Sequence, residues 1–310
     1  MLFHAGVPFV GGGFLGVDVF FVLSGYLITR IIHQRVSKNV FEFGVFYRSR
    51  ALRILPPLLL VSFVVWGFFG VLNQAIAETR IVPAILFYAN IDIASRYSPA
   101  IFNHAWSLSL EEQFYLLWPV VLLLLIKRTT FPERWVFLLY LCATVWKFHV
   151  TSLDYSWSQI YYAPDTRLSG LLLGSSLGLV CYKAKVPDVF MFLSFVALVA
   201  CFYSAEWGEK ETFYLQMPIV ELATATLIVG FANGVSRLER FFSCAVMVRL
   251  GSISYAMYLW HYPIAWVAND NFSPLMSFGV TFFLSFLLSE LTRRYVELPV
   301  SLLKRHSKKY

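Results

Sequence analysis

Two neighbouring carboxylates mark the start of an apolar stretch of the chain. Glu111 and Glu112 open a segment that stays apolar as far as Ile126. A charged side chain drawn toward hydrocarbon is costly, so such groups usually face a polar cavity, a substrate path or a partner charge. The pair therefore predicts a functional site inside or beside a membrane.

The residues that follow Glu111 support this interpretation. On a helix, Glu111, Tyr115 and Trp118 share one face because they are spaced at i, i+4 and i+7. An acid, a phenol and an indole would then line one wall of the site. The alternative is an interfacial anchor, in which the aromatic rings belong to the belt at the membrane surface and the acids lie in water.

The composition indicates that a membrane surrounds these residues. Hydrophobic residues make up 58% of the 310 residues and charged residues 14%, whereas soluble domains are typically about 25% charged. The mean hydropathy is +0.66. We expect an all-α, polytopic helix bundle that forms a single membrane domain over residues 1–310, with no appended soluble domain. The apolar runs that predict its spans are 14–32, 54–72, 112–126, 135–149, 166–182, 188–204, 216–233, 251–268 and 274–291.

The connectors between these runs alternate in charge. Cations gather in 30–53, 127–134, 183–185, 237–249 and 293–309, and acids dominate 154–165, 206–211 and the region of Asp270. The positive-inside rule places the basic connectors in the cytoplasm and the acidic ones outside. The net charge of +7 is therefore mainly a topology signal, and nucleic acid is not an expected partner.

The alternation of basic and acidic connectors requires that residues 80–111 begin and end on the same side of the membrane. The apolar piece 81–94 is interrupted by Pro83, Asn90 and Asp92. Irregular backbone at membrane depth is tolerated only inside protein or beside a cavity. We therefore expect 81–94 to be re-entrant or non-spanning, and to lie next to Glu111.

Two further patterns carry structural predictions only. Gly170, Gly174 and Gly178 repeat at i+4, a spacing that allows close helix packing. The four cysteines lack metal-ligand spacing and are interpreted as small buried hydrophobes. We expect neither a metal site nor a bound cofactor.

The amino end begins as if in the last turn of an apolar helix. His4 is followed by three consecutive glycines at 11–13, and no basic region or cleavage site suggests a signal peptide. If helix 14–32 runs inward, His4 lies at the external end of a truncated first helix. Nine complete spans and this helix would make ten.

Six segments in register resemble the integral-membrane acyltransferase family 3. They are 3–6 (FHAG), 13–25 (GFLGVDVFFVLSG), 46–56 (FYRSRALRILP), 104–115 (HAWSLSLEEQFY), 254–263 (SYAMYLWHYP) and 294–299 (RYVELP). The resemblance implies a ten-helix fold in a bacterial cytoplasmic membrane. It also implies an enzyme that moves an acyl group, commonly acetyl, from acyl-CoA as co-substrate to a hydroxyl of a cell-surface or secreted carbohydrate such as lipopolysaccharide. Members carry an Arg about three turns before the His that matches His4, and only three residues precede His4 here.

The resemblance assigns His4 as the general base, a task that suits imidazole because its ordinary pKa is about 6.5. Glu111 would orient that imidazole or hold the acceptor sugar. Asp18 is either a second polar partner in the site or half of a structural pair with an inward-facing Arg or His. The remaining candidates for substrate and donor binding are Ser24, His104, Glu112, Tyr115 and His261.

A cluster of arginines is the candidate site for the donor. Arg48, Arg50 and Arg53 lie on the predicted cytoplasmic side. Guanidinium groups suit the phosphates of coenzyme A, although each arginine alone could be an ordinary topology anchor.

Two other classes of protein stay open at this point. In a transporter or flippase, Asp18, Glu111 and His261 would form a proton or substrate path, but the inverted repeats of such proteins are not evident. The other alternative is an inactive homologue that lacks the first helix.

Overall fold

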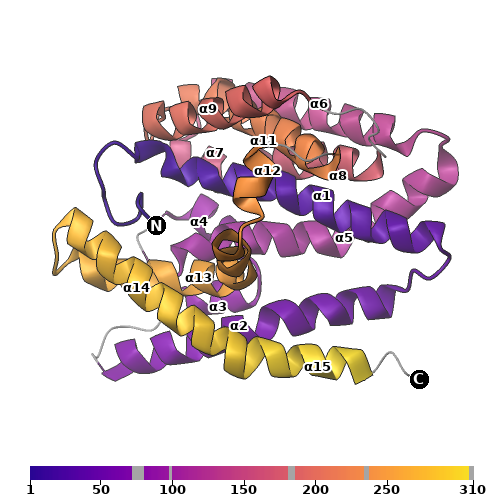
Figure 1. Cartoon of the computed structure of the whole chain (residues 1–310). Helices are drawn as coiled ribbons and strands as arrows, with labels where there is room; N and C mark the ends of the chain where they lie inside the picture. The colour runs from indigo at the N-terminus through magenta and orange to yellow at the C-terminus, as the bar shows by residue number, and fades with distance from the viewer. Residues whose placement is uncertain (72–79, 98–99, 181–185, 234–236, 307–310) are drawn as a thin grey trace.

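The computed structural model describes residues 1–71, 80–97, 100–180, 186–233 and 237–306, and all regular elements in these ranges are helical (Figure 1). In chain order they are η1 (Gly11–Leu15), α1 (Gly16–Ser37), α2 (Phe43–Val71), α3 (Ile81–Ile85), α4 (Ala89–Ser95), η3 (Asn103–Ala105), α5 (Trp106–Arg128), α6 (Pro132–Ser152), α7 (Trp157–Tyr162), α8 (Leu168–Leu179), α9 (Asp188–Ser204), α10 (Glu211–Tyr214), α11 (Gln216–Asn233), α12 (Arg237–Phe242), α13 (Ala245–Asn269), α14 (Pro274–Thr292), η4 (Arg293–Glu297) and α15 (Leu298–His306). The predicted all-α bundle is confirmed.

Each of the nine predicted apolar runs coincides with a helix in the described residues, but these helices differ in length. Among the described residues, five segments are long and apolar enough to cross a membrane: 11–37, 43–68, 103–128, 211–232 and 274–302. The run 166–182 yields only α8, whose 12 residues extend about 18 Å at 1.5 Å per residue, against a hydrocarbon core of about 30 Å. The chain is a multi-pass membrane protein in which some helices are enclosed by others.

The segment 81–94 forms two short helices, as its polar interruptions suggested. α3 and α4 are separated at Phe87, which has a positive φ of 55°. Neither helix is long enough to span a bilayer. The Asn90 and Gln113 amides exchange hydrogen bonds, and the Ala89 N–H donates to Ser109 Oγ at 3.2 Å. The segment therefore packs against α5, the helix that carries Glu111, which confirms the prediction.

Glycines bring α1 and α8 into close contact. A Cβ placed on Gly174 would overlap the Val22 carbonyl oxygen, and one on Gly25 would overlap the Leu171 carbonyl oxygen. The predicted role of the glycine repeat in α8 is confirmed, and Gly25 supplies the complementary small residue on α1.

In the described ranges, buried side chains form two hydrophobic clusters. The larger cluster joins α1 and α5 to α6, α8, α9 and α11. The smaller cluster joins α2, α3 and α13 to residues 101–108. Close contacts between α1 and either α2 or α13 are sparse, so the two clusters meet at a seam.

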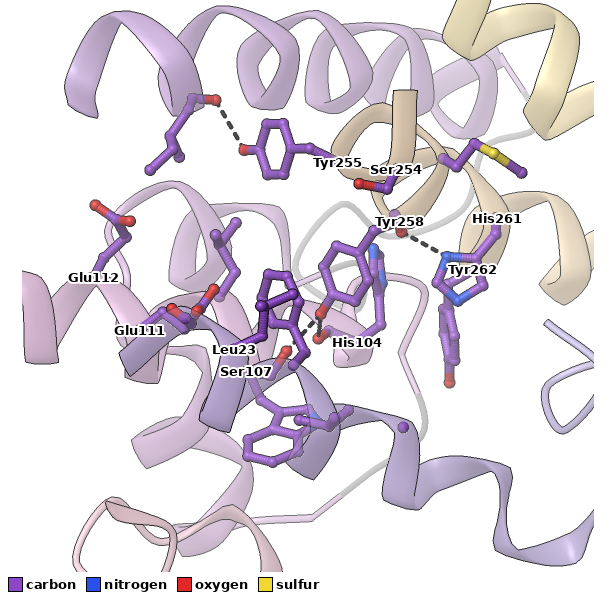
Figure 2. Close-up of a pocket in the computed structure, with 18 of the residues that line it drawn as sticks. Leu23, His104, Ser107, Glu111, Glu112, Ser254, Tyr255, Tyr258, His261 and Tyr262 are labelled. Carbon is purple, nitrogen blue, oxygen red and sulfur yellow. Dashed lines mark hydrogen bonds between the residues drawn. The ribbon is translucent and has the colours of Figure 1, made fainter. Parts of the chain in front are cut away.

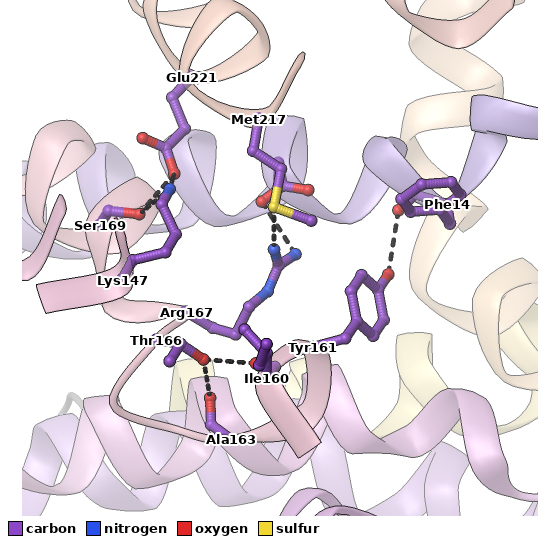
Figure 3. A network of polar contacts seen from close by, with 11 residues as sticks. Phe14, Lys147, Ile160, Tyr161, Ala163, Thr166, Arg167, Ser169, Met217 and Glu221 are labelled. Carbon is purple, nitrogen blue, oxygen red and sulfur yellow. Dashed lines mark hydrogen bonds and ion pairs between the residues drawn. The ribbon is translucent and has the colours of Figure 1, made fainter. Parts of the chain in front are cut away.

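A buried network of charged groups ties the helices of the larger cluster together (Figure 3). Lys147 Nζ lies 3.2 Å from Glu221 Oε1 and donates to Ser169 Oγ at 3.0 Å. An Arg167 nitrogen lies 2.9 Å from the Asp18 carboxylate. All four charged side chains are almost completely buried. The network links α1, α6, α8 and α11.

Candidate functional site

A cavity of about 1300 Å³ lies along the seam between the two clusters. Its walls come from α1, α2, α5, α13 and the first residues of the chain. Figure 2 shows the part to which Leu23, Glu111 and Tyr258 contribute. Nine of the residues predicted from the sequence line it: His4, Ser24, Arg50, Arg53, His104, Glu111, Glu112, Tyr115 and His261. Segments that are far apart in the sequence thus meet in one space.

One end of this set is organised around Tyr115. Its hydroxyl donates to Glu111 Oε1 at 3.0 Å and also bonds to the Ser24 hydroxyl on α1. The Arg50 guanidinium lies over the Tyr115 ring, 4.3 Å from its centre, a distance suited to a cation–π contact. The predicted common face of Glu111 and Tyr115 is confirmed. Trp118 lies on the same helix face but does not line the cavity. Its indole N–H instead donates to Thr29 Oγ1 at 2.7 Å.

The other end contains three imidazoles. The His261 ring centre lies 5.3 Å from that of His4 and 5.5 Å from that of His104. The Tyr262 ring stacks on His104 at 5.0 Å and meets the edge of His4 at 4.8 Å. The amino-terminal segment is held beside α13 because Asn269 Nδ2 donates to the His4 carbonyl at 2.7 Å.

Tyr258 forms hydrogen bonds with residues of the imidazole cluster and with Ser107, as Figure 2 shows. Its hydroxyl bonds to Ser107 Oγ at 2.8 Å and donates to the His104 carbonyl. Its own carbonyl lies 2.6 Å from His261 Nδ1. A carbonyl can only accept, so His261 carries its proton on Nδ1 in the neutral ring and presents the lone pair of Nε2. In the described ranges, no side chain is bonded to a ring nitrogen of His104.

His4 is suited to act as a neutral base. Burial lowers the pKa of its imidazole well below the usual value, and the positive charge that His261 can carry acts in the same direction. In the described part of the chain, the Glu111 carboxylate bonds to Tyr115, and no hydrogen bond joins it to an imidazole. The idea that Glu111 orients His4 directly finds no contact to support it.

Arginines occupy the end of the cavity opposite His4 along α1. Arg35, Arg50 and Arg53 line the cavity there, whereas Arg48 is exposed and is not part of the lining. From Phe14 to Arg35 the lining follows most of α1, a length of about 30 Å at 1.5 Å per residue. The cavity therefore has a basic end and an imidazole end.

Asp18 lies outside the lining and is engaged by Arg167 in the buried network. Of the two roles considered for Asp18, the structure supports the structural pair with an arginine. Within the described ranges, no group of three or more His, Cys, Asp or Glu side chains could hold a metal ion.

Several lining residues were not singled out from the sequence. They are aromatic and hydroxyl side chains near the imidazoles: Tyr97, Trp106, Ser107, Tyr161, Tyr162, Trp207, Tyr258 and Tyr262. Tyr258 carried a usable signal, because it precedes His261 by three residues and so shares a helix face with it. Tyr97, Tyr161, Tyr162 and Trp207 lie on loops and a short helix whose position depends on the fold.

Comparisons with known proteins agree with this picture. The family model described as an acyltransferase domain, Acyl_transf_3, matches residues 1–292. The chain is 29% identical over 335 aligned positions to O-acetyltransferase OatA of Staphylococcus aureus strain NCTC 8325, and equally to OatA of strain COL. Each alignment covers 97% of this chain and 54% of the relative, so the chain spans about half the length of these curated proteins. No solved structure matches it.

The family match covers most of the chain, includes all of the cavity-lining residues discussed above, and coincides with the helical membrane fold. The protein therefore belongs to the integral-membrane acyltransferase family 3.

Proposed function

We propose that the protein is a membrane O-acyltransferase that moves an acyl group, in the simplest case acetyl, from acyl-CoA to a hydroxyl of a cell-surface carbohydrate. The observation that carries this proposal is the single cavity with arginines at one end and imidazoles at the other. The names of the relatives, O-acetyltransferases, support acetyl as the group and oxygen as its acceptor atom.

The basic end suits the donor. Coenzyme A carries several phosphate charges, and guanidinium groups form strong charge-assisted hydrogen bonds with phosphate. Arg50 and Arg53 are one helical turn apart on α2 and both line the cavity. With the phosphates held there, the thioester arm would extend along α1 toward the imidazoles.

The imidazole end suits proton transfer. Neutral His4 would take the proton of the acceptor hydroxyl as its oxygen attacks the thioester carbonyl carbon. The resulting tetrahedral intermediate collapses when the carbon–sulfur bond breaks, and the thiolate leaves with the proton that His4 took. The products are the oxygen ester and coenzyme A with a free thiol. Transfer is thus a balanced reaction that needs neither a metal ion nor a redox cofactor.

The test is transfer of label from acetyl-CoA. Membranes containing the protein, supplied with acetyl-labelled CoA and solubilised cell-envelope carbohydrate, should form base-labile ester on the carbohydrate and release one free thiol per ester. Membranes with His4→Gln at the same protein level should not. Equal ester formation by the two preparations, or none by the wild type, would refute the proposal.

A further inference from the structure

Two exposed aromatic side chains stand at the rim of the imidazole end of the cavity. Tyr97, which follows α4, is 49% exposed, and Trp207, which precedes α10, is 41% exposed. Both line the cavity. Most other aromatic rings that line this end are buried or partly buried, so these two offer the largest free faces.

Each rim residue rests on a second aromatic ring. Tyr97 stacks on Tyr162, with the ring centres 5.9 Å apart and the planes 18° from parallel. Trp207 packs against Trp157, with the ring centres 4.0 Å apart. Rings packed against each other, whether stacked or tilted, restrict each other's orientation. The rim faces are therefore fixed before any ligand arrives.

The buried charge network supports this aromatic layer from below. The Arg167 guanidinium lies 4.7 Å from the centre of the Tyr161 ring and 5.5 Å from that of Trp106. Tyr161 in turn contacts both Tyr162 and Trp207, at 5.1 Å each. Because Asp18 holds Arg167, the layer beneath the rim is anchored to α1.

Polar groups stand directly beside the rim. His4 and His104 line the same end of the cavity together with Tyr262 and Asn103. His104 is buried, and no side chain among the described residues is bonded to its ring nitrogens. A site with broad aromatic faces and a few converging hydrogen-bonding groups suits a ligand that is apolar on its faces and polar at its edge. A pyranose ring has this character, since its C–H bonds form an apolar face and its hydroxyls a polar rim.

We propose that Tyr97 and Trp207 form a carbohydrate-binding subsite that holds a sugar ring of the acceptor beside His4. The identity of the reacting hydroxyl rests on the proposed function, whereas binding of sugar at this rim can be measured alone. A hydrocarbon chain is the less suitable occupant here, because the apolar stripe Phe20, Leu23, Leu27 and Ile31 lies farther along α1 toward Arg35.

The first test is equilibrium binding without an acyl donor. The probe is a fluorescently labelled oligosaccharide fraction released from the cell envelope, added to the detergent-solubilised protein. Tyr97→Ala and Trp207→Ala should each weaken binding about three- to tenfold, which corresponds to the usual worth of one aromatic contact. Tyr97→Phe and Trp207→Phe should bind nearly as well as the wild type, because they keep the ring.

Matched controls separate the rim from aromatic side chains elsewhere on the surface. Tyr155 is 48% exposed and Trp135 is 51% exposed, and neither lines the cavity. Tyr155→Ala and Trp135→Ala should leave binding unchanged. Equal losses in the rim and control variants, or no binding of the fraction by the wild type, would overturn the subsite.

The second test compares the KM for the carbohydrate with the KM for acetyl-CoA in the transfer reaction. Tyr97→Ala and Trp207→Ala should raise the apparent KM for the carbohydrate fraction by a similar factor and leave the KM for acetyl-CoA within about twofold. A rise in the donor KM instead would overturn the subsite. Sugar binding that depends on the rim, in a protein that forms no ester, would support the subsite and count against the proposed reaction.

Discussion

Tyr115 is the side chain through which the acidic, basic and hydroxyl groups of the cavity meet. Its hydroxyl contacts Glu111 and Ser24 while its ring carries Arg50. The sequence predicted that Glu111 and Tyr115 share a face, because helical spacing fixes that relation locally. The contacts with Ser24 and Arg50 join three helices, so spacing within one helix could not reveal them.

Removing Arg50 and Arg53 together should weaken use of the donor. Each charge-assisted contact is worth about 1.5–3 kcal/mol, so Arg50→Ala with Arg53→Ala should raise the KM for acetyl-CoA at least about tenfold. Arg48→Ala is the control, because Arg48 is exposed and outside the lining. If Arg48→Ala has the larger effect, or the double variant keeps its donor KM, these arginines are topology anchors only.

His4→Ala should reduce acyl transfer by roughly 10²–10⁴, the usual contribution of a positioned base. The base must be neutral, and the pKa of His4 is lowered, so the wild-type rate should rise with pH below the ordinary imidazole pKa and be level at neutral pH. That rise should vanish from the residual activity of His4→Ala. His149→Ala, an exposed imidazole, should behave as wild type, and an unchanged pH profile in His4→Ala would exclude His4 as the base.

The buried network illustrates what sequence patterns conceal at this scale. Lys147 and Glu221 stand inside predicted apolar runs, so their charges were visible in the sequence, but their pairing was not. For Asp18 the sequence left two roles open, and one was half of a structural pair with an Arg or His. That Arg167 is the partner depends on the packing of α1 against the start of α8. Partners separated by 74 or more positions cannot be matched from spacing on one helix.

Helix α8 shows most clearly how an element depends on its neighbours. It is short, glycine-rich and almost wholly buried, and α1 packs along it. The sequence predicted its position and its close packing from the glycine spacing. Its short length was not predicted, because hydropathy continued past Leu179 while the helix ends there.

Gly174→Ala should destabilise the fold, because the added Cβ would overlap the backbone of α1 at Val22. Overpacking of this kind costs about 1–3 kcal/mol, which should appear as a lower Tm of the detergent-solubilised protein. Gly279→Ala on α14 is the control, since a Cβ there meets nothing within 4 Å. A Tm for Gly174→Ala at or above that of Gly279→Ala would contradict the packing described for α1 and α8.

Lys147→Met should leave Glu221 buried without its cation, at a cost of about 3–5 kcal/mol. Lys147→Met combined with Glu221→Gln should recover much of the lost Tm, because no unpaired charge remains. Arg249→Met is the control, because it breaks an ion pair with Glu290 in which Arg249 is 46% exposed. Its Tm should fall little. If the double variant is no more stable than Lys147→Met alone, the pair is not what links α6 to α11.

For the whole molecule, the arginine end of the cavity lies on the same side of the bundle as three of the basic segments. The connector between α1 and α2, the connector between α5 and α6, and α15 lie at one end of the bundle, at the right in Figure 1. The amino-terminal segment lies at the other end. The basic connectors at 183–185 and 307–309 fall outside the described residues, so they add nothing to this comparison.

Topology reporters can check this orientation. A reporter fused after Phe102 or Tyr155 should be external, and one fused after Thr129 should be cytoplasmic, because α3 and α4 do not cross the membrane. Asn73, the matching position before α3, lies outside the described residues. A cytoplasmic signal at Phe102 would mean that the segment before α5 crosses the bilayer.

The cavity also determines where the electrical potential of the membrane acts. The lining that follows much of α1 is largely apolar, so we expect the voltage to drop gradually along the length of the cavity. One elementary charge that crosses a quarter of a 100 mV drop gains or loses about 0.6 kcal/mol, a factor of about three in affinity. When the cytoplasm is negative, an anionic donor entering from that side moves in the favourable direction. Membrane voltage would then draw the donor into its site, and proteoliposomes with an imposed potassium gradient should show a lower donor KM as the interior equivalent to the cytoplasm becomes more negative.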